Sequence, residues 1–158
     1  MPQSDFRHSH RLRVRYGEGD QQGVVFNARY LDYGDIAVTE YWRAVGFRFV
    51  GEDVMEFHVA HASVDFKKPI RPDELIDLWT RTEKIGNTSM TTLVEIHGAT
   101  ADGGADLRAT IREVQVHVDL STHTPKPIPD SVKDQFRAFD ARAETVFSGD
   151  RQPLVLGT

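Results

Sequence analysis

The stretch from Arg13 to Phe47 constrains the fold most strongly, because its hydrophobic period changes partway along. At residues 10–16 apolar and polar side chains alternate, which predicts a half-buried strand. Two glycines then break the pattern, and at residues 28–45 the apolar residues take helical spacing. Gly34 lies within the apolar stripe of this predicted helix, where glycine costs roughly 1 kcal/mol relative to alanine. We therefore expect a long core helix that another element approaches closely at Gly34.

After residue 56 the chain reads as extended segments separated by turn residues. The pattern predicts four more strands, at residues 57–67, 74–85, 88–99 and 106–120. Short turns between consecutive strands imply an antiparallel meander. Val132, Phe136 and Phe139 fit a short amphipathic helix near the end. This order predicts an α+β protein with one long helix set against one sheet.

The chain length of 158 residues suits a single domain. We assign residues 1–9 to a loose N-terminal segment, residues 10–140 to the domain and residues 141–158 to a tail with little pattern. One helix covers only one face of a sheet, so a second copy of the chain is expected to cover the other face or an edge.

Composition narrows the classes of function. The net charge of -5 and a pI of 5.8 argue against nucleic acid or an anionic membrane as a partner. The chain has no cysteine, which excludes disulfides, thiolate metal sites and a cysteine nucleophile. His58 and His61 are three residues apart on a predicted strand, so they face opposite sides, and we expect neither a metal nor another cofactor. With no signal sequence and no long apolar run, the expected location is cytoplasmic.

The segment from Asp20 to Tyr30 reads DQQGVVFNARY, between a strand and a long helix. In this context the motif D-x-x-G-V-V-x-N-x-x-Y resembles the hotdog-fold acyl-CoA thioesterases, above all 4-hydroxybenzoyl-CoA thioesterase and its bacterial acyl-CoA relatives. KKPIRPDELIDLWTRTEKIGNTSMT and HVDLSTHTPKPIPD are similar to further strands of that family. The resemblance spans about residues 10–140. It implies a hotdog fold, a five-stranded antiparallel sheet wrapped round one long helix, and a homodimer or homotetramer with active sites at the subunit interface.

Asp20 is the predicted catalytic residue. Hydrolysis of a thioester needs a nucleophile or a base that activates water. The chain offers no cysteine and no serine in a G-x-S-x-G elbow, which leaves a carboxylate. In the resembled family the matching aspartate attacks the carbonyl or activates water, and both roles stay open here. By residue type alone, Asp20 also suits an ordinary turn.

The residues that follow Asp20 are expected to hold the substrate. Backbone N–H groups near Phe26 and Asn27 open the predicted helix and can polarise a carbonyl oxygen. Gly23 fits a turn with positive φ beside them, and Tyr30 completes the motif. Asn27 is the second predicted catalytic residue, and its side chain either orients the thioester or water, or caps the helix.

Coenzyme A carries phosphates, so cations are expected at the mouth of the site. Lys67 and Lys68 are the predicted phosphate contacts. Some family members have a basic run where this chain has Gly86-Asn87-Thr88, which leaves these contacts less defined.

Two other functions compete with an acyl-CoA thioesterase. A non-catalytic acyl-CoA or lipid-binding dimer would keep the fold and tolerate loss of Asp20. A hydratase or dehydratase of the same fold would pair the aspartate with a histidine five residues later. This chain has Val25 at that position, which counts against a hydratase or dehydratase.

Overall fold

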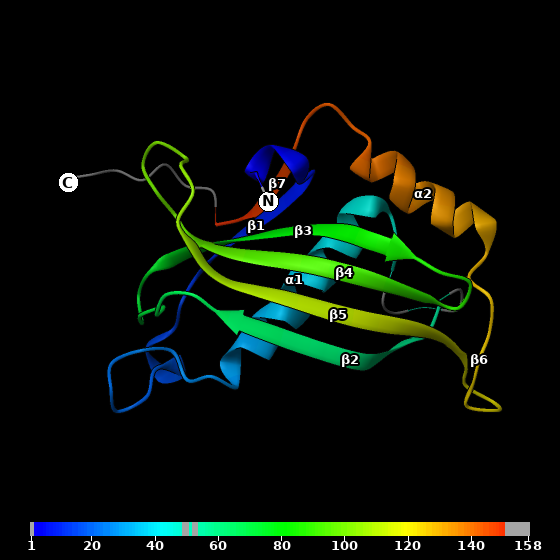
Figure 1. Cartoon of the computed structure of the whole chain (residues 1–158), viewed down its shortest axis with the longest axis horizontal. Coiled ribbons are helices and arrows are strands. Elements are labelled where there is room, and N and C mark those ends of the chain that lie inside the picture. The colour runs from blue at the N-terminus through cyan, green and yellow to red at the C-terminus, as the bar shows by residue number, and fades with distance from the viewer. Residues whose placement is uncertain (1, 49–50, 52–53, 151–158) are drawn as a thin grey trace.

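A computed structural model describes residues 2–48, 51 and 54–150. Of the predicted tail, residues 141–158, the structure therefore describes only residues 141–150. Figure 1 shows a curved sheet with one long helix running across its far side and a shorter helix at one end. The elements, in chain order, are η1 (Gln3–Asp5), β1 (His8–Arg13), η2 (Tyr16–Glu18), α1 (Arg29–Val45), β2 (Phe57–Phe66), β3 (Leu75–Ile85), β4 (Ser89–Gly98), β5 (Leu107–Asp119), β6 (Thr124–Pro125), α2 (Asp130–Asp140) and β7 (Val146–Gly149).

The α+β class is confirmed, but the expected count of five strands is wrong. The sheet has seven strands in the order β2-β5-β4-β3-β1-β7, with the short β6 paired to β5. It is not wholly antiparallel, because β7 pairs with β1 in parallel. The meander is also shorter than predicted. It joins β3, β4 and β5, whereas β2 pairs with β5 at the far edge.

The sheet topology has physical reasons that alternation alone does not reveal. Alternation reports which face a side chain takes and not which strand lies beside it. The β2–β3 connection contains Pro69 and Pro72 and crosses from one edge of β5 to the far side of β4. The four-residue β7 is too short to give a periodic signal.

The long helix α1 agrees closely with the prediction. It begins at Arg29 and ends at Val45, and Gly46 follows with φ 121° while its N–H donates to the carbonyl of Trp42. Its buried face includes Tyr33, which the sequence analysis did not place there. The close approach at Gly34 is confirmed. A Cβ on Gly34 would lie 3.5 Å from the Ile111 side chain and 3.0 Å from Glu113 Oε1 on β5.

The second helix, α2, buries the three residues that its spacing predicted, Val132, Phe136 and Phe139. Its last residue, Asp140, fixes it to the sheet. The Asp140 carboxylate accepts hydrogen bonds from the Thr82 N–H (3.0 Å) and the Tyr41 hydroxyl (2.9 Å). Burial raises the pKa of Asp140.

Strand β2 forms one edge of the sheet, and most of its residues are exposed. Val59 and Phe66 are 57% and 52% exposed although both are large and apolar. An unpaired edge of this kind can pair with another strand. It lies at the lower border of the sheet in Figure 1.

Candidate active site

The loop between β1 and α1 folds into a compact turn around Asp20. The Asp20 N–H donates to the Val24 carbonyl (2.8 Å), and the Gly23 N–H donates to the Asp20 carbonyl (3.1 Å). Gly23 has φ +76°, the left-handed conformation expected of a turn glycine. Gly19 and Val25 form an isolated antiparallel bridge that closes the loop.

The Asp20 side chain is exposed at the tip of this turn. Its Oδ1 accepts a hydrogen bond from the Gln22 N–H at 2.8 Å. Asp20 therefore stabilises the turn, which is the structural role that its residue type suggested. Within the described residues no hydrogen bond reaches Oδ2, so one carboxylate oxygen remains available for chemistry.

The backbone donors at the start of α1 differ from one another. The Phe26 N–H is already used, because it donates to the Glu18 carbonyl at 3.1 Å, so the expectation that it is a free donor is wrong. The sequence gives no sign of this bond, which depends on how the loop folds back on η2. In the part of the chain that the structure describes, no carbonyl accepts the Asn27 N–H. That N–H remains the candidate to polarise a substrate carbonyl.

Asn27 does not cap the helix. The cap position is Ala28, and no side chain makes a capping hydrogen bond there. Of the two roles considered for its amide, capping is therefore excluded. The exposed Asn27 side chain is available to orient a bound molecule.

A cavity of about 370 Å³ opens beside this loop, between the start of α1 and the end of β2. It brings together four of the predicted residues, Asn27, Tyr30, Lys67 and Lys68. Asp20, Gly23 and Phe26 are not among its lining residues. Their loop continues directly into Val24 and Val25, which line the cavity together with Phe66 and Pro69.

Phe66 is a site residue that the sequence analysis missed. Its ring packs edge-on against the ring of Tyr30, with centroids 4.8 Å apart, and both side chains line the cavity. Tyr30 is buried, and this burial raises the pKa of its phenol, so the side chain stays neutral. The position of Phe66 immediately before Lys67-Lys68 was the available signal.

The two lysines at the mouth are not equivalent. Lys68 Nζ lies 2.8 Å from Asp106 Oδ1, in a surface pair of modest strength. Hydrogen bonds from Arg108 and then from Lys68 lower the pKa of Asp106 to about 2. Within the described ranges the Lys67 ammonium group forms no ion pair. Lys67 is therefore more available than Lys68 to bind a phosphate.

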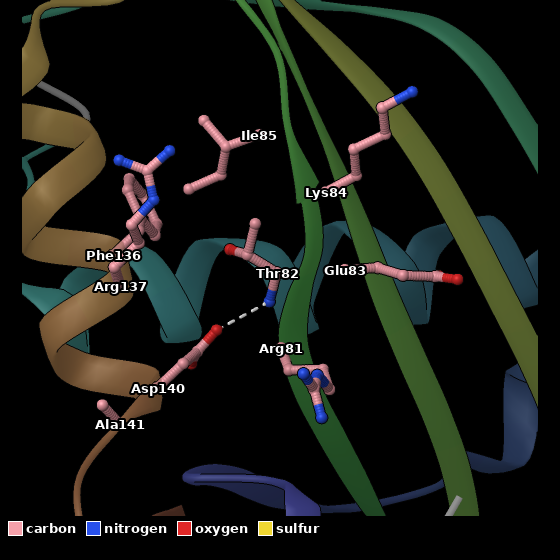
Figure 2. A pocket seen from close by; sticks show the side chains of 9 residues that line it. All are labelled: Arg81, Thr82, Glu83, Lys84, Ile85, Phe136, Arg137, Asp140 and Ala141. Atoms are coloured by element: carbon pink, nitrogen blue, oxygen red, sulfur yellow. Dashed lines mark hydrogen bonds between the residues drawn. The ribbon is translucent and has the colours of Figure 1, made fainter.

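A separate cavity of about 360 Å³ lies between β3 and α2. Figure 2 shows Asp140 reaching from α2 to the backbone nitrogen of Thr82, while Glu83 and Lys84 point away from α2. None of the predicted site residues lines it. A break in the β3–β4 register between Thr82 and Lys84 makes room for this junction.

Comparison with known proteins identifies the family. Residues 14–136 match the family model of the thioesterase-like superfamily, and the chain belongs to it. The predicted family of thioester hydrolases is thereby confirmed. The acyl-CoA thioesterase YbgC of Haemophilus influenzae is 31% identical over 77 residues, which cover 47% of this chain. The chain spans 57% of that relative, and 66% of a second curated relative from Aquifex aeolicus.

Solved structures support the same fold. A thioesterase of Thermus thermophilus, complexed with coenzyme A and Zn, is 25% identical with TM-score 0.74, covering 90% of this chain and 98% of that one. The 1,4-dihydroxy-2-naphthoyl-CoA thioesterase of Synechocystis is 19% identical with TM-score 0.73, covering 85% and 98%. Neither helix of the described chain is long and apolar enough to cross a membrane.

Proposed function

We propose that this chain is an acyl-CoA thioesterase, which hydrolyses acyl-CoA to a free acid and coenzyme A. One arrangement carries the proposal. The cavity at Asn27, with an uncommitted backbone N–H in its wall and lysines at its mouth, adjoins a turn that presents the Asp20 carboxylate. Membership in the thioesterase-like superfamily supports the same chemistry.

In the proposed mechanism the thioester carbonyl accepts a hydrogen bond from the Asn27 N–H. Asp20 acts in one of two ways. As a general base it takes a proton from water while the water oxygen adds to the carbonyl carbon. As a nucleophile it forms an anhydride that water then hydrolyses. In both routes the C–S bond breaks, and the coenzyme A sulfur leaves as a thiolate that is then protonated.

The remaining predicted residues would bind the substrate around this centre. Lys67 and Lys68 attract the phosphates of coenzyme A, with Lys67 contributing more because Lys68 is paired to Asp106. Tyr30 and Phe66 form the apolar wall for the start of the acyl group or the pantetheine arm. Gly23 holds the turn that positions Asp20.

We propose a homodimer formed through β2, which can pair further into a homotetramer. The exposed edge of β2, with Val59 and Phe66 on it, would be covered by the same strand of a second copy. This pairing places the partner beside the cavity at Phe66. The proposed location is the cytoplasm, where acyl-CoA is available to the enzyme.

The two competing functions make different predictions. A hydratase needs a histidine near Val25, but Val25 is 1% exposed and its N–H donates to the Ile70 carbonyl. That position contributes a buried apolar side chain to the cavity wall. A non-catalytic acyl-CoA-binding dimer would bind the same ligands without releasing thiol.

The deciding experiment measures thiol release from a panel of aromatic and aliphatic acyl-CoA esters by the wild type and Asp20→Asn. The asparagine preserves size and the hydrogen bond from Gln22, so the fold should survive. We expect kcat to fall by at least about 10²-fold with a much smaller change in KM. Asn27→Ala is the control, because it removes the exposed amide but keeps the backbone N–H, and it should cost less. A folded Asp20→Asn variant with near wild-type turnover would refute the mechanism.

A further inference from the structure

A third cavity, of about 440 Å³, is lined by residues of β1, η2 and α1 and by the end of β7. The loop between β1 and α1 contributes to this cavity as well as to the one at Asn27. Arg15 and Glu18 line the third cavity, whereas Val24 and Val25 line the cavity at Asn27. The loop that carries Asp20 therefore joins the two cavities.

Tyr33 is the unusual residue in the third cavity. It is 0% exposed, and its hydroxyl makes no hydrogen bond within the part of the chain that the structure describes. Its ring packs edge-on against the ring of Tyr30, with centroids 6.3 Å apart. A buried hydroxyl without a partner destabilises a protein, and phenylalanine would pack the same ring without that cost. The arrangement of the free protein thus gives no reason for the hydroxyl.

The Glu18 carboxylate is a partner for this hydroxyl. It lines the same cavity, and its negative charge, second to burial, raises the pKa of the Tyr33 phenol. Tyr33 therefore keeps its proton and can donate it in a hydrogen bond. Glu18 Oε1 accepts the Arg15 N–H at 2.6 Å, and among the described residues no hydrogen bond reaches Oε2. Hydrogen bonds at active sites are often long or poorly aligned in the free protein and tighten when substrate binds.

Glu18 is connected to both groups of the proposed mechanism. Asp20 follows it by two residues, at the tip of the turn. The Glu18 carbonyl accepts the Phe26 N–H at 3.1 Å, which fixes the residue before Asn27. A displacement of Glu18 therefore moves the Asp20 carboxylate and the Asn27 N–H together. Misplacing reacting groups by about 1 Å can slow a reaction by about 10²-fold.

We propose that Glu18 and Tyr33 are positioning residues, and that a hydrogen bond from the Tyr33 hydroxyl to the Glu18 carboxylate holds the loop in its working geometry. In that geometry Asp20 and the Asn27 N–H face the same substrate carbonyl. This inference rests on the proposed thioesterase function and deepens it. Neither positioning residue lines the cavity at Asn27, so we expect both to act on kcat rather than on substrate binding.

The first test compares two buried tyrosines of α1. Tyr33→Phe removes a hydroxyl that has no hydrogen bond in the free protein, so the urea midpoint should stay near that of wild type. Its kcat for acyl-CoA should fall by about tenfold or more with little change in KM, because a hydrogen bond to a charged group is lost. Tyr41→Phe removes hydrogen bonds to Thr82 and Asp140, so it should lower the urea midpoint and keep the wild-type kcat.

The second test varies Glu18. Glu18→Ala should lower kcat by about 10²-fold with KM near wild type. Glu18→Gln keeps an acceptor for the Arg15 N–H and for the Tyr33 hydroxyl, so it should recover most of kcat. Glu83→Ala is the matched control, because Glu83 pairs with Arg112 elsewhere on the sheet, and it should keep the wild-type kcat. Adding Tyr33→Phe to Glu18→Ala should cost little more, since the two residues act through each other.

The possible failures are distinguishable. Unchanged kcat in Tyr33→Phe, or fully multiplicative losses in the double variant, overturn the positioning role and leave thioesterase function standing. Circular dichroism confirms folding, and Tyr33→Phe decides the matter if Glu18→Ala does not fold.

If the wild type cleaves none of the esters, the proposed function fails, and amide hydrogen exchange then tests the inference without activity. The Phe26 N–H should exchange at least about tenfold faster in Glu18→Ala than in Glu83→Ala, because the loop opens locally. Equal exchange at Phe26 in the two variants would end the inference.

Discussion

Substitution of Gly34 tests how closely α1 and β5 approach each other. A Cβ at this position would be 3.5 Å from Ile111, an ordinary contact, and 3.0 Å from Glu113 Oε1, a tight one. Alanine gains up to about 1 kcal/mol of helix propensity, and the Glu113 side chain must move by a few tenths of an ångström. These effects oppose each other, so Gly34→Ala should change the free energy of unfolding by less than about 1 kcal/mol.

Gly34→Leu should behave differently. Its branched end has no space between Ile111 and Glu113, and overpacking of a core typically costs about 1–3 kcal/mol. We expect this loss despite the good helix propensity of leucine. Arg43→Leu is the control, because it places leucine on the exposed side of the same helix, where Arg43 is 64% exposed.

Urea unfolding monitored by circular dichroism gives the comparison, with midpoints and slopes fitted separately. A double-mutant cycle with Glu113→Ala locates the clash, since the cost of Gly34→Leu should shrink once the carboxylate is removed. A Gly34→Leu protein as stable as wild type would show that β5 does not approach the helix as described.

Three further predictions concern charge, anchoring and assembly. The pKa of Glu113 is raised in the folded state, so the folded protein binds its proton more tightly and stability falls as pH rises from the unfolded-state pKa through the folded one. Glu113→Gln should therefore melt above wild type at pH 8, with a gap that closes toward pH 4; a gap independent of pH in thermal scans contradicts this. Asp140→Ala leaves the Thr82 N–H without its acceptor, whereas the Tyr41 hydroxyl keeps its hydrogen bond with Thr82 Oγ1; the variant should cost about 1–3 kcal/mol, and Asp140→Asn, which keeps an acceptor, should cost less in the same urea assay. Val59→Lys should shift dimers toward monomers in light scattering, and the equally exposed Leu120→Lys should not; equal effects would exclude β2 as the interface.

The sequence predicted best those features that depend on a long, regular pattern. Helix α1 was predicted at 28–45 and lies at Arg29–Val45, because many turns of consistent spacing outweigh any single residue. Gly46 ended it as expected. The first strand was displaced, from residues 10–16 to His8–Arg13, because alternation continues beyond the paired residues. The partner of β2 could not be predicted, since it depends on a crossover and not on any local pattern.

At the candidate site, the motif identified residues but not their hydrogen bonds. Asn27, Tyr30, Lys67 and Lys68 share a cavity, although the lysines lie far from the motif in the chain. The occupied Phe26 N–H depends on the fold of the loop, which leaves no trace in residue type. The role proposed for Glu18 also escaped sequence analysis, because residue type does not show that its carboxylate shares a cavity with the Tyr33 hydroxyl.

The exposure of Asp20 links catalysis to assembly. A carboxylate open to water gains little from nearby dipoles, because water screens them, whereas a site closed off from water strengthens every such interaction. In one chain the turn at Asp20 and the cavity beside Phe66 both face solvent. A second copy bound at the β2 edge would lie beside this cavity and could close it. We therefore expect activity to require the dimer, so that specific activity falls on dilution in step with the monomer fraction measured by light scattering, and Val59→Lys loses both together. A monomeric Val59→Lys variant with full kcat would show that one chain forms a complete active site.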